Sequence, residues 1–151
     1  MSNEAKSDSL TFNVSLRWDH STGAEAFTKA GAIRLDMPKD FGGLGRYPCP
    51  DEVFLSALGG CMITTFIYFQ RRLGAKIDGM EVSVDGEVKL DSGGYRITNI
   101  KIKLKVLAES PELEKVTRCA KLAIEYCHLT RSIKPAIAVM TEYEVISPNH
   151  S

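Results

Sequence analysis

Two cysteines, Cys61 and Cys127, are the residues of this chain whose type and placement most directly suggest chemistry. Each lies on the apolar side of its own predicted helix. Two thiols that meet in a protein core form a dithiol, which can cycle through a sulfenic acid and a disulfide. Thiol redox chemistry is therefore the leading hypothesis. Inert packing is the alternative, because free cysteine is among the most buried residue types.

The other cysteines and the histidine beside Cys127 suggest less. Cys49, between two prolines, is either an incidental loop thiol or an accessory redox thiol, and Cys119 is interpreted as packing. His128 raises the question of a metal site, but zinc usually takes four ligands with close pairs such as Cys-x-x-Cys, and the sequence has no such pair. We therefore expect no metal. No bound cofactor is expected either, since the glycines lack the spacings of phosphate or dinucleotide loops.

Composition limits the classes of protein to consider. The 151 residues fit one domain, which we expect to span residues 10–148 after a flexible polar N-terminus, residues 1–9. Basic and acidic residues both number 19, so no positive excess is available to bind nucleic acid or an acidic membrane surface. The polar N-terminus has no secretory signal, and four cysteines are too few for a disulfide framework. We expect a cytoplasmic protein with thiols that are reduced at rest.

Two helices are predicted. The first begins at Pro50, has Asp51 and Glu52 in its first turn, and ends at Gly74. It is apolar nearly all round, so we expect it to be buried on most sides, and its Gly59-Gly60 interruption and short apolar run argue against a membrane span of roughly 20 residues. The second helix opens with Ser110 as its N-cap and carries an apolar stripe spaced by three or four residues: Leu113, Val116, Ala120, Ile124 and Cys127.

Five segments alternate apolar and polar residues, as half-buried strands do: 10–18, 27–37, 80–90, 100–106 and 137–145. This alternation is typical of antiparallel sheets covered on one side. Ser92-Gly93-Gly94 is predicted to link two of the strands as a tight hairpin. Residues 38–50, with three prolines and three glycines, are predicted to form a loop. The fold class is therefore α+β.

The run from Pro50 to Cys61, with a carboxylate after the proline and Gly-Gly before the cysteine, resembles the first-helix motif of the OsmC/Ohr family of hydroperoxide-resistance proteins. Segments 127–133, 141–145 and 32–43 resemble that family's second-cysteine motif, its closing strand, and the strand and glycine-rich loop before the first helix. The resemblance covers about residues 10–146. It implies a two-layer α+β fold, antiparallel-rich sheets around two main helices, and an intertwined homodimer with active sites at the subunit interface.

The resemblance also implies roles for individual residues. Cys61 matches the peroxidatic cysteine and Cys127 the resolving cysteine. Asp51, ten residues before Cys61, stands where peroxidase members have a glutamate, whereas Glu52 matches the carboxylate of a less characterised OsmC-like branch. Peroxidase members also have an arginine in the turn after the first strand, but residues 20–25 contain none. Arg17 and Arg46 are the nearest candidates.

The function expected from these residues is thiol-dependent reduction of organic hydroperoxides. Cys61 would become a sulfenic acid, Cys127 would condense with it, and an external dithiol would reduce the disulfide. The partners expected are a second copy of the chain, an organic hydroperoxide and the dithiol, without nucleic acid or membrane. The alternative is a non-catalytic module of the same fold that binds a small apolar or acyl ligand at the dimer interface, with the cysteines as lining.

Overall fold

The computed structural model describes residues 8–148. The chain divides into two compact units, Met1–Val53 and Phe54–Ser151, and each is described by itself. The expected flexible N-terminus, residues 1–9, lies almost wholly outside the described residues. The expectation of a single domain over residues 10–148 stays a prediction.

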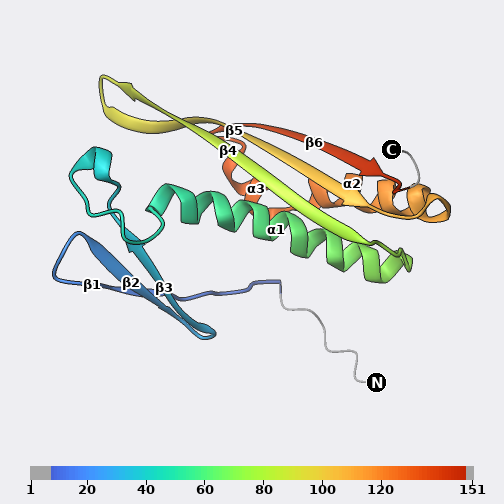
Figure 1. Ribbon diagram of the computed structural model, residues 1–151, viewed down its shortest axis with the longest axis horizontal. Coiled ribbons are helices and arrows are strands. Elements are labelled where there is room, and N and C mark those ends of the chain that lie inside the picture. The colour runs from blue at the N-terminus through green and yellow to red at the C-terminus, as the bar shows by residue number, and fades with distance from the viewer. Residues whose placement is uncertain (1–7, 149–151) are drawn as a thin grey trace. The chain divides into compact units, whose positions relative to one another are not determined.

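The first unit contains a three-stranded antiparallel sheet in the order β1-β2-β3 (Figure 1). Its strands are β1 Ser15–Trp18, β2 Gly23–Thr28 and β3 Gly31–Asp36. The prediction of one strand over 27–37 was wrong, because the chain reverses at Lys29 and Ala30, and β3 then begins at Gly31, whose φ of 144° suits glycine. This hairpin joins the end of β2 to β3.

The predicted strand 10–18 forms only in its last part. β1 pairs with β2 from Ser15 to Trp18, and within the described residues no strand pairs with 10–14. The apolar residues of this segment are exposed rather than half-buried: Leu10 76%, Phe12 87%, Val14 52%, Leu16 55% and Trp18 64%. The first unit therefore offers nothing that covers this apolar row.

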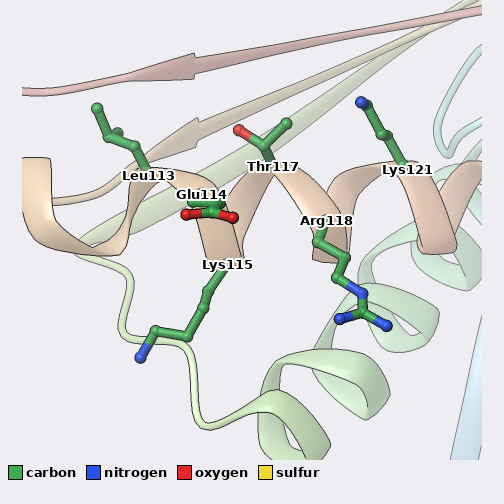
Figure 2. Close-up of a pocket in the computed structure, with 6 residues that line it drawn as sticks. All are labelled: Leu113, Glu114, Lys115, Thr117, Arg118 and Lys121. Atoms are coloured by element: carbon green, nitrogen blue, oxygen red, sulfur yellow. The ribbon is translucent and has the colours of Figure 1, made fainter.

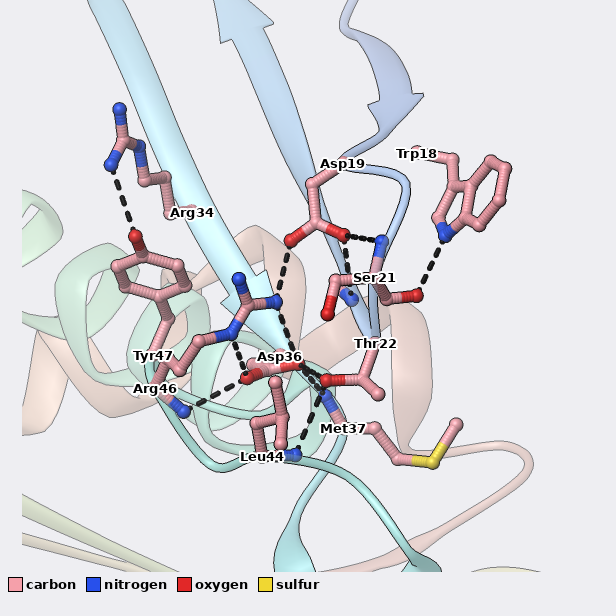
Figure 3. A network of polar contacts seen from close by, with 11 residues as sticks. Trp18, Asp19, Ser21, Thr22, Arg34, Asp36, Met37, Leu44, Arg46 and Tyr47 are labelled. Atoms are coloured by element: carbon pink, nitrogen blue, oxygen red, sulfur yellow. Dashed lines mark hydrogen bonds and ion pairs between the residues drawn. The ribbon is translucent and has the colours of Figure 1, made fainter.

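A polar network ties the loop after β3 to the sheet (Figure 3). The buried carboxylate of Asp36 accepts hydrogen bonds from Arg46 Nε at 2.9 Å and from Thr22 Oγ1 at 2.6 Å. Arg46 Nη2 also donates to Asp19 Oδ2 at 2.6 Å. These bonds attach the predicted loop, which contains only the short 3₁₀ helix η1 Lys39–Phe41, to β3 and to the β1–β2 turn.

The second unit has a three-stranded sheet, β4 Gly79–Asp91, β5 Gly94–Leu107 and β6 Ala138–Ile146. The hairpin between β4 and β5 turns at Ser92 and Gly93, as predicted. The antiparallel expectation was wrong for β6, which pairs with β5 in parallel. Between β5 and β6 the chain crosses over through helices, which a parallel pair requires, and these helices lie with α1 on one face of the sheet (Figure 1).

Helix α1 Pro50–Leu73 has the predicted bounds. The second predicted helix begins with a 3₁₀ turn, η2 Ser110–Glu112, continues as α2 Leu113–Tyr126, and is followed after Cys127 by a separate helix, α3 His128–Ile133. The pattern of the sequence predicted Cys127 at the end of one helix and did not predict α3. Cys119, interpreted as packing, is fully buried on α2.

One side of α1 packs against the second unit's sheet. Leu58, Met62 and Phe66 are buried in the same apolar cluster as the inward residues of β5. A Cβ on Gly59 would lie only 3.2 Å from Val84 Cγ2, so this glycine permits the close approach of α1 to β4. By length and composition α1 could also cross a membrane, but the core helix of a soluble protein passes the same test. One side of α1 is buried against the sheet of the second unit.

The expectation that α1 is buried on most sides was wrong for the chain as described. Its opposite side is exposed at Ser56, Ala57, Gly60 and Thr64. A Cβ on Gly60 would meet no atom within 4 Å. The second unit therefore covers one side of the helix only.

Replacing Asp36 with Asn should destabilise the protein near neutral pH, because the buried carboxylate is the charged acceptor for Arg46 and Thr22. Arg46 first, and then Thr22, hold the pKa of Asp36 well below its usual range, against the opposing effect of burial. Since the folded-state pKa is lowered, the stabilisation is present above the unfolded-state value of about 3.9 and is lost as the pH falls towards the folded-state value.

The measurement is the urea midpoint of wild type and Asp36→Asn at about pH 7 and about pH 3. The deficit of the variant should be large at the higher pH and smaller at the lower. Glu144→Gln is a control, because its ion pair with Lys103 is exposed. An equal Asp36→Asn deficit at both pH values would contradict the proposed charge interaction.

Candidate functional site

Cys61 lies on the buried side of α1, with 6% of its surface exposed. Its Sγ atom is 3.5 Å from Nδ1 of His128 and 4.0 Å from Oγ1 of Thr65. The Thr65 hydroxyl donates to the carbonyl oxygen of Cys61 at 2.7 Å, as threonines often do one helical turn after their acceptor. Two polar neighbours of this buried sulfur are thus an imidazole from another helical segment and a hydroxyl from α1 itself.

Cys127 is placed by the bend between α2 and α3. Its backbone N–H donates to Ala123 O as the last bond of α2, and its carbonyl accepts from Arg131 N as the first bond of α3. Its φ of −58° and ψ of 105° are not helical, so the chain changes direction at this residue. The side chain is fully buried in the apolar core that also contains Cys61.

Thr130, also fully buried, donates from Oγ1 to Cys127 Sγ at 3.1 Å. Burial is the largest influence on this thiol and raises its pKa above the ordinary value. The Thr130 hydrogen bond lowers the pKa, and interaction with the Cys61 thiol raises it further. The two predicted redox cysteines, from segments far apart in the chain, thus lie in one buried apolar cluster, and both are free thiols.

The predicted carboxylates lie at the start of α1. Glu52 Oε2 accepts the backbone N–H of Cys49 at 2.9 Å, which is the return bond of a helix capping box. Asp51 is exposed and lines an apolar hollow of about 750 Å³ in the first unit. Ten residues separate Asp51 from Cys61 along α1, a rise of roughly 15 Å, so one helix cannot bring them together. The structure gives Glu52 a capping role and does not bring Asp51 to the thiol of the same chain.

The two arginine candidates are engaged inside the first unit. Arg46 is held by Asp19 and Asp36, which together raise its pKa above the ordinary value. The Arg17 guanidinium lies 5.2 Å from the centre of the Phe27 ring. Neither observation places an arginine beside Cys61.

The described residues form no metal-binding group, and one of their surface hollows involves neither redox cysteine. Residues 8–148 contain no group of three or more side chains of the kinds that hold a metal ion. A surface hollow along α2 is lined by Leu113, Glu114, Lys115, Thr117, Arg118 and Lys121, without either redox cysteine (Figure 2). There Lys115 joins Glu112 at 3.2 Å and Gly74 O at 3.3 Å, so it connects the start of the second helical segment to the end of α1.

The sequence suggested His128 only as a metal ligand and gave no sign of its contact with Cys61. Its position directly after Cys127 was visible in the sequence. The bend that turns it towards α1 was not, because a continuous α-helical pattern through residue 127 suggested a helix end instead of a junction between two helices. The contact is a tertiary one.

The chain is similar to a known protein family and to several solved structures. A family model described as OsmC-like protein matches residues 43–142, which include Cys61, Cys127 and His128. No curated protein matches the chain. Among solved structures, an OsmC-like protein from Mycoplasma pneumoniae has a TM-score of 0.77 at 14% identity, and the match covers 91% of this chain and 98% of that one.

Two further structures are similar. An organic hydroperoxide resistance protein OsmC from Legionella pneumophila has a TM-score of 0.70 at 14% identity, with 90% of this chain and 98% of that chain covered. An organic hydroperoxide resistance protein from Elizabethkingia anophelis, with thiocyanate bound, has a TM-score of 0.73 at 14% identity, with 93% and 100% covered. At these identities the likeness shows the fold, and it confirms the α+β arrangement predicted for the chain.

Thr130→Val should raise the pKa of Cys127, because valine keeps the shape of threonine but cannot donate to the thiolate. At a fixed pH, alkylation of Cys127 should then slow by about tenfold, the effect of losing a hydrogen bond of about 1.5 kcal/mol to a charged group. The measurement is site-resolved mass spectrometry of alkylated Cys127 over a pH series.

Thr117→Val is the matched control, because Thr117 lies on α2 among the residues of the surface hollow and away from both redox cysteines. It should leave the titration of Cys127 unchanged. If Cys127 titrates identically in wild type and Thr130→Val, the hydrogen bond has no influence on the thiol.

Proposed function

The chain belongs to the OsmC-like protein family, and on that basis we propose that it is a thiol-dependent peroxidase that reduces organic hydroperoxides. The family resemblance found in the sequence is confirmed, and membership supports a redox role in hydroperoxide resistance. The peroxidase activity, its residues and a cytoplasmic location are our proposals.

The observation that carries the proposal is that two buried free thiols, one from α1 and one from the α2–α3 bend, lie in the same apolar core cluster. Two cysteines placed separately in a core would be packing. Two that share one buried cluster can convert a sulfenic acid into a disulfide once their sulfurs meet. The Thr130 hydrogen bond supports this use, because it stabilises the thiolate form of Cys127 that must attack.

The proposed cycle has three steps, and atoms and electrons balance in each. The Cys61 thiolate attacks the terminal peroxide oxygen, the O–O bond breaks, and the products are a cysteine sulfenic acid and, after protonation, an alcohol. The Cys127 thiolate attacks the oxidised sulfur, which forms the disulfide and releases water once a proton is supplied. An external dithiol then reduces the disulfide by two thiol–disulfide exchanges and is itself oxidised. The cycle requires no bound cofactor.

We further propose that the active protein is a homodimer. The apolar row of residues 10–18 is exposed in the first unit, and one side of α1 is exposed in the second unit. An exposed row of large apolar side chains, such as that of residues 10–18, is characteristic of interfaces, and small residues on a helix face permit close approach of a second chain. A dimer would also allow Asp51 of one subunit to act at Cys61 of the other, which the separation along α1 prevents within one chain.

One observation favours a second candidate, a non-catalytic module that binds a small apolar or acyl ligand. The hollow of about 750 Å³ in the first unit is lined mainly by apolar residues, among them Leu16, Leu35, Met37 and Phe41. Such a hollow suits an apolar ligand. It would equally suit the organic part of a hydroperoxide, so activity decides between the two candidates.

Cys61→Ser should reduce dithiol-dependent consumption of cumene hydroperoxide to the uncatalysed rate, because the attacking sulfur is gone. Cys127→Ser should still react once, and its Cys61 should accumulate as a sulfenic acid or be overoxidised. Peroxide loss with a lipoyl-type dithiol and mass spectrometry of Cys61 measure both effects. Cys49→Ser, a change in the loop, is the control and should keep wild-type activity. Equal rates for wild type and Cys61→Ser, with no sulfenic acid in Cys127→Ser, would favour the ligand-binding module.

Phe12→Asp should weaken the dimer, because a charge would replace an apolar side chain that we expect the second subunit to cover. Sedimentation velocity at micromolar concentration should show wild type as a dimer and the variant shifted towards monomer. Thr11→Asp adds the same charge to the alternate face of the segment and is the matched control. A stable folded wild-type monomer would exclude the proposed dimer.

A further inference from the structure

His128 is the first residue of α3, and its contact with Cys61 joins an exposed side chain to a buried one. The residue is exposed, whereas the sulfur that its Nδ1 approaches to 3.5 Å is almost fully buried. The bend at Cys127 produces this geometry, since the residue after the bend turns away from the core while its ring lies against α1. The imidazole thus joins a buried thiol to the solvent side of the site.

No other basic side chain among residues 8–148 lies within hydrogen-bonding distance of Cys61 Sγ. Arg46 is committed to two carboxylates, and Arg17 lies over an aromatic ring. Thr65 is the other polar neighbour of the sulfur, but its proton is donated to the Cys61 carbonyl. Among the described residues, His128 is therefore the side chain placed to accept the proton of the Cys61 thiol.

We propose that His128 is a catalytic residue that accepts the proton of the Cys61 thiol and delivers it to the leaving alcohol. This inference depends on the proposed peroxidase function for its second step, but the first step is independent of it. Histidine suits both steps, because its unperturbed pKa of about 6.5 allows it to accept and release a proton near neutral pH. The arrangement is a Cys–His pair of the kind that activates nucleophilic cysteines.

The proton and electrons balance in each step. Nδ1 of neutral His128, with its proton on Nε2, takes the proton of Sγ and leaves a thiolate beside an imidazolium. The sulfur electron pair forms the S–O bond as the O–O bond breaks, which oxidises the sulfur and reduces the peroxide. The imidazolium then gives its Nδ1 proton to the alkoxide, so the alcohol leaves neutral and His128 returns to its starting form.

The inference also explains how this chain can do without an arginine in the turn after the first strand. An arginine stabilises a thiolate by its charge and its N–H donors but cannot accept or return a proton near neutral pH. His128 would supply both charge and proton transfer from the same subunit. The carboxylate pair at the start of α1 would then be unnecessary for forming the thiolate.

The test measures two reactions of Cys61 in the full-length protein. Alkylation by iodoacetamide, read at Cys61 by mass spectrometry, reports thiolate formation and does not depend on peroxidase activity. Single-turnover oxidation by cumene hydroperoxide in Cys127→Ser reports attack on the peroxide. His128→Asn should slow both by at least about tenfold, since positioned acid–base groups contribute about 10² to 10⁴.

The matched control is His20→Asn. His20 is an exposed histidine of the first unit with a φ of 64°, a conformation that asparagine tolerates, so this change should leave both rates unchanged. In His128→Ala, which opens a space beside the thiol, added imidazole should restore alkylation of Cys61 by at least several-fold. Thermal unfolding of each variant establishes that it is folded, and His128→Gln provides a second test if His128→Asn is not.

The outcomes separate the two proposals. Slower alkylation that imidazole restores supports His128 as the proton acceptor even if wild type consumes no peroxide, in which case the peroxidase function fails alone. Wild-type alkylation and oxidation rates in folded His128→Asn or His128→Gln would overturn the inference. Slower alkylation in His128→Ala that imidazole leaves unchanged would also overturn it, because a merely structural role would give that result.

Discussion

The candidate site depends on the bend of the chain at Cys127. Had α2 continued as a regular helix, the residues after Cys127 would have followed its axis. At the bend, one backbone group of Cys127 ends α2 and the other begins α3, so the helices are joined without a loop. The same residue therefore carries a buried thiol in the core cluster that contains Cys61, and the exposed residue after it, His128, contacts Cys61.

The exposed side of α1 is also fixed by local packing. Cys61 follows two glycines, Gly59 and Gly60, whose surroundings differ. Gly59 faces the sheet and allows α1 to approach Val84 closely, whereas Gly60 faces open space. One side of α1 therefore packs against the core and carries the Cys61 thiol. At Gly60, on the next side, a Cβ would contact no other atom within 4 Å. The exposed side is where we expect the second subunit.

Thiol chemistry in an apolar core works against the thiolate, because burial raises the pKa of a cysteine. The structure shows this for Cys127, whose pKa is raised, and also for Cys119, where burial acts without a redox partner. Thr130 provides Cys127 with one compensating hydrogen bond. His128 is placed to provide Cys61 with a different kind of help, a proton acceptor that remains in contact with solvent.

Local signals in the sequence were sufficient for α1, for the β4–β5 hairpin and for the loop around η1. Capping residues, terminal glycines and period-two alternation act over a few residues, so they identify these elements without reference to the rest of the chain. The two cysteines could be selected in the same way, from their positions on apolar helical faces and from the motifs around them.

Tertiary structure alone decided the rest. Alternation in 137–145 shows that one face of a strand is covered but carries no information about the direction of its neighbour, so the parallel pairing of β6 could not be seen. The hairpin before Gly31 could not be predicted because the apolar–polar alternation continues through it. The bend at Cys127 could not be predicted because the apolar stripe of the helix continues up to it. The contact between His128 and Cys61 joins residues 67 positions apart, and only the packing of α3 against α1 brings them together.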